Sequence, residues 1–291
     1  MLFDFNRSVR SRTVIIAVSL FLTLLANVTF FKNVLEVYEL TWSLAPMIVS
    51  LAIVLWAVQV LLFTLLGSRY VLKPLLITVL LVSSMTAYFM DTYDIVVDTH
   101  MIENIMQTDL HESMDLFSIG QVLYFLILGV LPSIVIYRLN LERLSFKAAI
   151  IEKLKTIGFT LGIIVVIIFG FSKFYTSFFR EHKPLRLYTN PTYYLYSIEK
   201  YIQESFFHPI TGLKHTGHDA KIPTPDTDRE LIILVVGEAA RWDHFSLNGY
   251  QRQTNPLLVK EDIVNFSNFT SCGTETAVSV PCMFSYAGRE K

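Results

Sequence analysis

The chain has 291 residues, of which 53% are hydrophobic and only 17% are charged. Soluble globular domains usually carry about 25% charged residues, so this composition, with a mean hydropathy of +0.48, excludes an ordinary soluble protein and indicates an integral membrane protein. The net charge of −1 argues against a strongly basic nucleic-acid binder.

Five apolar runs follow one another along the first part of the chain, and each approaches the ~20 residues that cross a bilayer core. The first run is too long for the apolar part of a cleaved signal peptide, so we expect an uncleaved first helix. The sequence therefore predicts a multi-pass α-helical membrane domain with five helices over residues 1–174. The predicted spans are Thr13–Phe31, Pro46–Leu66, Leu72–Met90, Ser118–Tyr137 and Ile157–Phe174.

The charges of the connecting segments predict how these helices are oriented. Basic residues gather in the N-terminal arm and in the loops after the second and fourth runs, which belong in the cytoplasm by the positive-inside rule. The loop 91–117 has seven acidic residues and no Lys or Arg, so it belongs outside. Five spans then place everything after Phe174 outside as well, in a compartment where disulfides persist.

Two further segments have helical features. Thr99–Ser113 carries apolar residues close to helical spacing and predicts a helix on the outer membrane surface of the bundle; the alternative is an acidic, solvated face. Within the connection 175–229, tyrosine and phenylalanine residues predict an interfacial helix from Asn190–Pro191 to about Ser205. The polar segment Gly212–Arg229 then reads as a linker.

Residues 230–291 are expected to begin an α/β domain. The apolar run Leu231–Val236 is typical of a strand buried on both faces of a parallel sheet, and it ends at Gly237 and Glu238. The remaining predicted elements are a helix over Ala239–Asn248, a turn at Asn248–Gly249, a second strand over Asp262–Phe269 and a helix containing Ala277–Met283.

The chain has only two cysteines, Cys272 and Cys282, and they bracket the hydroxyls of Thr274, Thr276 and Ser279. A carboxylate such as Glu238 at a strand end is a hard ligand for Zn²⁺ or Mn²⁺. A hydroxyl becomes a good nucleophile only when a metal or a base removes its proton. Local chemistry does not choose among the three hydroxyls: Thr276 also suits a helix N-cap, and Glu238 also suits a helix start.

At these residues the sequence resembles a known family. SCGTETAVSVPCMFS, VVGEAARWDHFSLNGY, the TNP of residues 254–256 and MIENIMQTDLHES are similar to segments of the membrane-bound lipid A phosphoethanolamine transferases of Gram-negative bacteria, including the mobile colistin-resistance type. The resemblance implies an alkaline-phosphatase/sulfatase-like periplasmic domain and zinc, with Mn²⁺ less favoured. It also implies that Thr276 is the nucleophile and a metal ligand, and that Glu238 is a metal ligand. Cys272 and Cys282 match a disulfide, and Asn104 and Glu112 match positions linked to phosphoethanolamine binding.

The resemblance implies a reaction in two steps at the bacterial inner membrane. The Thr276 alkoxide attacks the phosphorus of phosphatidylethanolamine and releases diacylglycerol, and a lipid A phosphate then takes the phosphoethanolamine. The product gains an ammonium group, so polymyxins would bind the surface less well. We expect a monomer that contacts membrane lipids and no nucleic acid.

The sequence departs from the family at its end. From Leu231 to Lys291 there are 61 residues, whereas each βαβ unit needs about 30, so we expect an incomplete sheet and further metal ligands outside this chain. His244 is nearby, but the family pattern does not make it a ligand. Two alternatives therefore stay open: an inactive truncated membrane fragment, and a related transferase of phosphoglycerol or another lipid head group.

Overall fold

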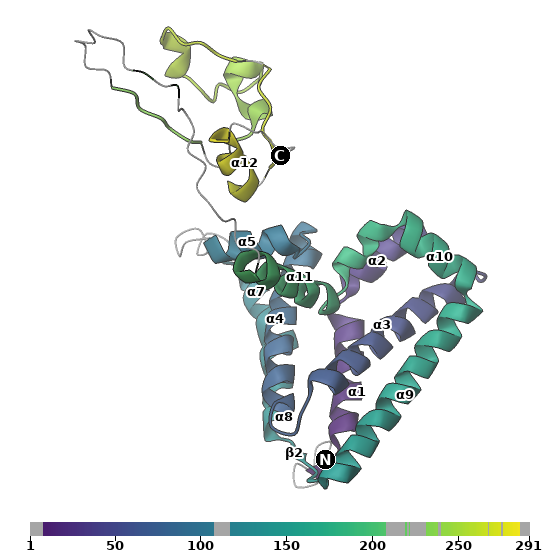
Figure 1. Ribbon diagram of the computed structural model, residues 1–291. Coiled ribbons are helices and arrows are strands. Elements are labelled where there is room, and N and C mark those ends of the chain that lie inside the picture. Colours follow the sequence, from purple (N-terminus) through teal and green to yellow (C-terminus); the bar gives the residue numbers. More distant parts are fainter. Residues whose placement is uncertain are drawn as a thin grey trace. The chain divides into compact units, whose positions relative to one another are not determined.

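The apolar runs form long helices in the computed structural model, which describes residues 8–107, 117–207, 219, 221, 231–237, 240–266, 268–274 and 276–285. The chain divides into two units, Met1–His208 and Pro209–Lys291. The helices of the first unit are α1 (Ser11–Leu25), α2 (Val28–Val37), α3 (Ala45–Leu66), α4 (Leu72–Tyr93), α5 (Thr99–Gln107), α7 (Ile119–Tyr124), α8 (Leu131–Arg138), α9 (Phe146–Gly170), α10 (Ser172–Glu181) and α11 (Thr192–Ile202). Figure 1 shows α1, α3, α4, α8 and α9 side by side in a bundle.

Shorter elements complete the first unit. A π-helical turn, η1 (Phe125–Val130), joins α7 to α8, and a 3₁₀ segment, η2 (Lys183–Tyr188), precedes α11. The π-helical turn η3 (Gln203–Phe207) extends α11, so the helix predicted from Asn190–Pro191 to about Ser205 lies close to its predicted bounds. The strands β1 (Ser8–Val9) and β2 (Asn140–Leu141) pair in parallel at the end of the bundle where α1 begins.

The number of membrane spans agrees with the prediction, but the first span has a different shape. Among the described residues, four helical stretches are long and apolar enough to cross a membrane, and α1 with α2 makes a fifth if this pair, bent by 54°, counts as one span. A single straight helix over Thr13–Phe31 is therefore wrong. At the break, the Asn27 side chain donates to the carbonyl of Leu22 at 2.8 Å.

The fifth span begins at Phe146, well before the predicted Ile157. Ser145 caps this helix by accepting a hydrogen bond from the backbone N–H of Ala148 at 3.4 Å. A side-chain acceptor at this position satisfies one of the backbone donors that a helix start leaves open. The helix therefore starts within the basic segment that precedes the apolar run.

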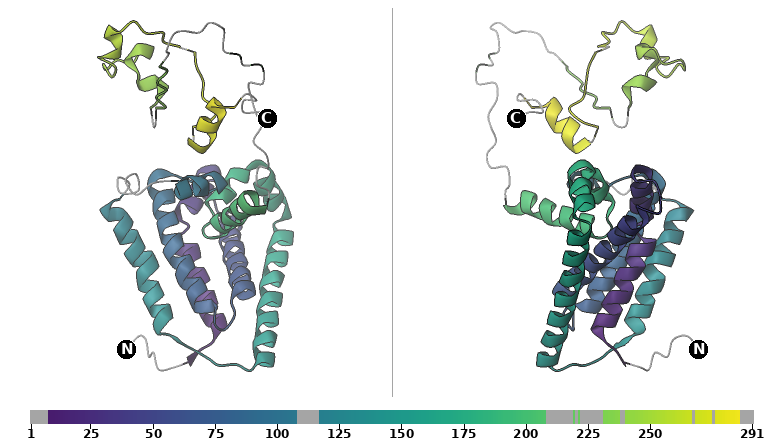
Figure 2. Two further views of the ribbon diagram at one scale, coloured as in Figure 1. Left: turned by 60° about the vertical axis from the view of Figure 1, so that its left-hand side comes forward. Right: turned by 90° about the vertical axis from the view of Figure 1, so that its right-hand side faces the viewer.

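A buried polar network ties the segment before α11 to the bundle. Asn27 donates to the carbonyl of Asn190 at 2.7 Å and accepts from its backbone N–H at 2.8 Å. Gln59 donates to the same carbonyl, and the Asn190 side chain donates to the carbonyl of Ser83 at 2.9 Å. These residues are at most 2% exposed. Since buried polar groups need partners, the network fixes where α11 leaves the bundle (Figure 2).

The second unit has short helical elements and differs from its predicted α/β pattern. Its elements are the 3₁₀ turns η4 (Trp242–His244), η5 (Ser246–Asn248) and η6 (Leu258–Lys260) and the helix α12 (Thr276–Met283). The predicted strands at Leu231–Val236 and Asp262–Phe269 are not formed in the described part of this unit, and Leu231–Val236 is 41–86% exposed. A two-sided buried strand needs paired neighbours and helices over both faces, and these described residues provide neither.

The predicted helix Ala239–Asn248 is likewise replaced by η4 and η5, with Phe245 extended between them. The predicted turn at Asn248–Gly249 is confirmed, because Gly249 adopts φ 97°, a conformation that glycine tolerates at little cost. The predicted helix over Ala277–Met283 is also confirmed by α12.

Candidate active site

Thr276 is the first residue of α12, and it is exposed. The backbone N–H groups of a helix start have no partners within the helix and carry partial positive charge. A hydroxyl at this position lies where an anionic group such as a phosphate is bound favourably. Thr274 is also exposed, whereas Ser279 is partly buried within α12.

Covalent and steric contacts hold the loop before α12. A disulfide joins Cys272 to Cys282, with 6.3 Å between their Cα atoms, and so ties the loop to the last turn of the helix. Gly273 passes close over the helix: a Cβ atom at this position would lie 2.9 Å from Cγ1 of Val278. The loop therefore needs glycine at 273 to lie against the helix that carries Thr276.

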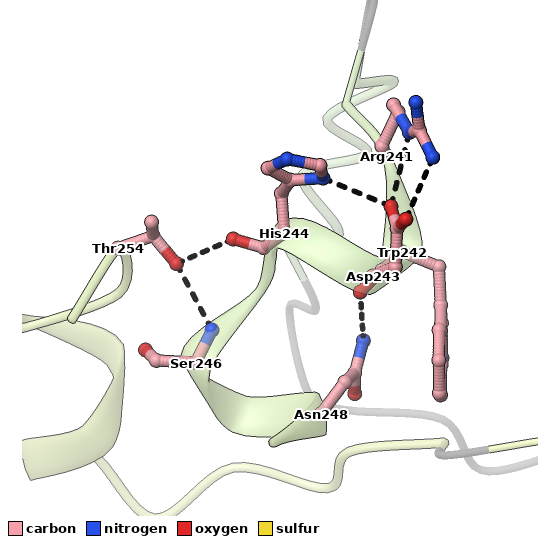
Figure 3. Close-up of polar contacts among 7 residues, drawn as sticks. All are labelled: Arg241, Trp242, Asp243, His244, Ser246, Asn248 and Thr254. Atoms are coloured by element: carbon pink, nitrogen blue, oxygen red, sulfur yellow. Dashed lines mark hydrogen bonds and ion pairs between the residues drawn. The ribbon is translucent and has the colours of Figure 1, made fainter. Parts of the chain in front are cut away.

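A second polar cluster lies in the turn formed by η4 and η5 (Figure 3). The Arg241 guanidinium donates two hydrogen bonds to the Asp243 carboxylate, at 3.0 and 2.6 Å. The His244 ring lies on the other side, with Nδ1 2.9 Å from Asp243 Oδ1. The hydrogen bonds from Arg241 and then His244 lower the pKa of Asp243 to about 2. This carboxylate is thus held ionised by its neighbours.

Thr254, further along the chain, stabilises the same turn with two hydrogen bonds to its backbone. Its hydroxyl donates to the carbonyl of His244 at 2.7 Å and accepts from the backbone N–H of Ser246 at 2.9 Å. Asn265 then donates to the carbonyl of Leu247 and to the side chain of Asn248. Hydrogen bonds thus connect Thr254 and Asn265 to the turn of η4 and η5, and sequence reasoning missed Arg241, Asp243 and Asn265. The close spacing of opposite charges in RWDH was the available signal.

The helix α5, which carries the predicted site residue Asn104, lies in the first unit. Asp98 caps α5 by accepting from the backbone N–H of Met101 at 2.8 Å, and α5 packs against α11. Burial, followed by the charge of Asp98, raises the pKa of Tyr193 in α11. Asn104 lies in α5, is partly buried and interacts with other residues of the chain. At least one acid of the loop 91–117, Asp98, therefore caps a helix that packs against the rest of the unit.

Two of the predicted site residues, Glu238 and Glu112, lie outside the described part of the chain. Within the described ranges, no group of three or more His, Cys, Asp or Glu residues gathers as a metal site. The structure therefore places Thr276, Cys272 and Cys282 together, and it places Asn104 in the other unit.

Comparisons with known proteins show which family the chain resembles. Residues 55–206 match the family model for phosphoethanolamine transferase EptA/EptB, and residues 230–291 match the sulfatase model. The chain is 40% identical to phosphatidylethanolamine transferase Mcr-1 of Escherichia coli, covering 99% of this chain and 54% of that protein. It is 22% identical to Kdo(2)-lipid A phosphoethanolamine 7''-transferase of Escherichia coli K12, covering 71% and 39% of the two chains.

A solved structure also resembles this chain along almost its whole length. The chain resembles the integral membrane protein lipooligosaccharide phosphoethanolamine transferase A (EptA) from Neisseria meningitidis with a TM-score of 0.85 and 28% identity, covering 98% of this chain and 54% of that one. The chain spans about half the length of the curated relatives it matches. Because the EptA/EptB match extends over more than half of the chain, the family is established. This chain belongs to the EptA/EptB family of phosphoethanolamine transferases, with a helical membrane domain followed by the start of a sulfatase-like domain.

Proposed function

We propose that the protein transfers phosphoethanolamine from phosphatidylethanolamine to a phosphate of lipid A through a covalent intermediate on Thr276. The observation that carries this proposal is the position of Thr276: it is exposed at the first residue of α12, beside a disulfide-held loop, in the segment that matches the sulfatase model. The names of the relatives Mcr-1 and the Kdo(2)-lipid A enzyme support these two substrates.

The proposed reaction exchanges one oxygen substituent on phosphorus in each step. Thr276 Oγ1 forms a bond to the phosphorus of phosphatidylethanolamine, and the bond to the diacylglycerol oxygen breaks. The hydroxyl proton of Thr276 is lost, and diacylglycerol leaves with a proton on its oxygen. A lipid A phosphate oxygen then attacks the same phosphorus and loses its proton, and the Thr276 oxygen leaves and takes up a proton, which restores the hydroxyl. The backbone N–H groups at the start of α12 favour the charge on the phosphoryl oxygens.

Zinc is the metal we propose for this site, in preference to Mn²⁺, with Glu238 and Thr276 as ligands. A bound divalent ion lowers the pKa of a coordinated hydroxyl. A catalytic zinc usually has three protein ligands, and the described residues do not assemble such a set. The metal assignment therefore rests on the family resemblance, and no step above depends on it.

The outer helix α5 is the proposed binding element for the donor head group. Asn104 would hydrogen-bond the phosphoethanolamine, and the Glu112 carboxylate would pair with its ammonium group. Both substrates are membrane lipids, which accounts for a reactive domain attached to a helical bundle. We place the bundle in the bacterial inner membrane as a monomer, with the residues after α9 in the periplasm, because its basic loops favour the cytoplasm.

The test is expression from the complete gene in a polymyxin-sensitive Gram-negative host, followed by mass spectrometry of lipid A. We expect lipid A carrying one added phosphoethanolamine and a higher polymyxin tolerance, both lost in Thr276→Ala. Thr274→Ala is the matched control, because it removes another exposed hydroxyl two residues away and should keep the product. Unmodified lipid A from the unaltered protein, or a phosphoglycerol product, would overturn the proposal in favour of the alternatives.

A further inference from the structure

A cavity of about 610 Å³ lies at the end of the membrane unit that carries the basic loops. The start of α1, the connection between α3 and α4, the segment after β2 and the first turns of α9 surround it. Figure 1 shows these elements at the opposite end of the bundle from α5 and α11. By the positive-inside rule this end faces the cytoplasm, so the cavity is separate from the proposed transferase site.

The cavity has a surplus of positive charge. Two of its charged side chains are already engaged: Glu142 accepts from Arg10 at 3.2 Å, and Lys73 donates to the carbonyl of Tyr137 at 3.0 Å. Of the four other cations that line it, Arg69 lies over the Tyr70 ring, 5.4 Å from its centroid, and the remaining three are Arg12, Arg143 and Lys153. Within the part of the chain that the structure describes, these three have no ion pair or hydrogen bond.

The walls of the cavity suit a lipid better than a free solute. Its inner wall contains Thr64 and Leu72, each 2% exposed, and Ile15. On the outside, α9 exposes apolar side chains such as Ile150 and Leu154 along a helix that is long enough to span the membrane. Acyl chains can therefore lie against α9 while a head group enters the cationic cavity.

Glu152 limits which lipid head groups suit the cavity. Glu152 lines the cavity, and its Oε1 atom is buried without a hydrogen-bond partner among the described residues. A buried carboxylate oxygen needs a donor, because leaving it unsatisfied is costly. Once the Glu152 side chain turns this oxygen towards the cavity, a head group with both a phosphate and a hydroxyl satisfies the cations and this oxygen together.

We propose that this cavity binds an anionic glycerophospholipid of the cytoplasmic leaflet, with phosphatidylglycerol as the simplest example. The phosphate pairs with Arg12, Arg143 and Lys153, and a glycerol hydroxyl donates to Glu152. Basic pockets between membrane helices on the cytoplasmic side are suited to such head groups, and charge-assisted hydrogen bonds to phosphate are strong. The bound lipid would hold together the start of α1, β2 and α9.

Native mass spectrometry of the purified full chain in detergent tests this assignment, with phosphatidylglycerol as the probe. Phosphatidylcholine and phosphatidic acid with the same acyl chains, and inorganic phosphate, serve as competitors; phosphatidylethanolamine is left out because it is the proposed donor substrate. We expect the protein to retain phosphatidylglycerol at least about tenfold more tightly than phosphatidylcholine, and inorganic phosphate to leave it bound. Equal retention of both lipids, or displacement by inorganic phosphate, overturns the lipid site.

Two charge-matched triple variants locate the site. Arg12→Gln, Arg143→Gln and Lys153→Gln together should weaken retention about tenfold or more. Arg138→Gln, Lys147→Gln and Lys155→Gln remove the same charge from exposed positions outside the cavity, and should change retention less than about twofold. Equal weakening by both triples would show general attraction to the basic end and would overturn the site.

A single variant tests the hydroxyl contact. Glu152→Gln should reduce the preference for phosphatidylglycerol over phosphatidic acid, which lacks the glycerol hydroxyls, and an unchanged preference would refute that contact. The competition measurement on the unaltered protein keeps the proposal testable if a variant fails to fold. All readouts are lipid binding, so they do not depend on the proposed transferase activity.

Discussion

The two units of the chain satisfy their polar groups in different ways. In the membrane unit, Asn27 and Asn190 are at most 2% exposed and bond to each other across 163 positions of sequence. In the described part of the second unit, side-chain hydrogen bonds join residues at most 18 positions apart, and most of them are exposed. The first unit is therefore specified by buried long-range contacts, and the second by local turns and a disulfide.

This difference predicts where a single substitution has the largest effect. Asn27→Leu removes the acceptor for the backbone N–H of Asn190 and leaves that group buried without its partner. Burying an unsatisfied donor costs about 1–3 kcal/mol, so we expect a clear fall in the stability of the purified protein, measured by thermal unfolding in detergent.

Thr23→Val is the matched control for that change. Thr23 lies one helical turn before Asn27 and is 1% exposed, and its hydroxyl oxygen has no hydrogen-bond partner among the described residues. Replacing it with an apolar side chain of similar shape should leave the stability unchanged or raise it slightly. Equal destabilisation by both variants would contradict the importance of the Asn27–Asn190 network.

A smaller effect is expected in the second unit from Gly273→Ala. The added Cβ atom would lie 2.9 Å from Cγ1 of Val278, so the loop must shift away from α12. Overpacking costs about 1–3 kcal/mol in a packed core, and this loop, whose neighbours Ser271 and Thr274 are exposed, can shift, so we expect a cost at the low end of that range. Hydrogen exchange of the loop before Thr276 should become faster in Gly273→Ala and should recover in the double variant with Val278→Ala. No recovery would show that the contact with Val278 is not the cause.

The two units also differ in how much of their structure the sequence predicts. The runs that form α3 and α4 begin and end within a few residues of their predicted bounds, because a long apolar segment has few alternatives in a membrane. The break at Asn27 was not predictable, since its partner Asn190 lies far along the chain. The predicted strands are not formed among the described residues, because a strand buried on both faces needs neighbouring strands and covering helices, and the described residues supply neither.

The candidate site was predictable in part. The spacing of the two cysteines and the hydroxyls pointed to the loop before α12, and the structure joins Cys272 to Cys282 around it. The pairing of Arg241 with Asp243 was missed, because a helix expected over Ala239–Asn248 would point these side chains differently. Two consecutive 3₁₀ turns bring them together.

The smallest expected effect is a pH-dependent change in that turn. The folded pKa of Asp243 is lowered to about 2, below its usual value near 3.9. The contribution of this carboxylate is therefore complete above about pH 4 and is lost as the pH falls towards 2. The near-ultraviolet signal of Trp242 should change over this range, and Asp243→Asn should abolish the change. Asp262→Asn, which alters an exposed acid outside the turn, should leave the change in place.

The central claim is that the hydroxyl at the start of α12 carries the transferred group. The most direct measurement is the mass of the peptide containing Thr276, from protein expressed from its complete gene and purified from membranes rich in phosphatidylethanolamine. The account predicts a fraction of this peptide with one phosphoethanolamine on Thr276, and an increase of that fraction when lipid A is absent. A modification on Thr274 or Ser279, or lipid A transfer that persists in Thr276→Ala, would contradict it.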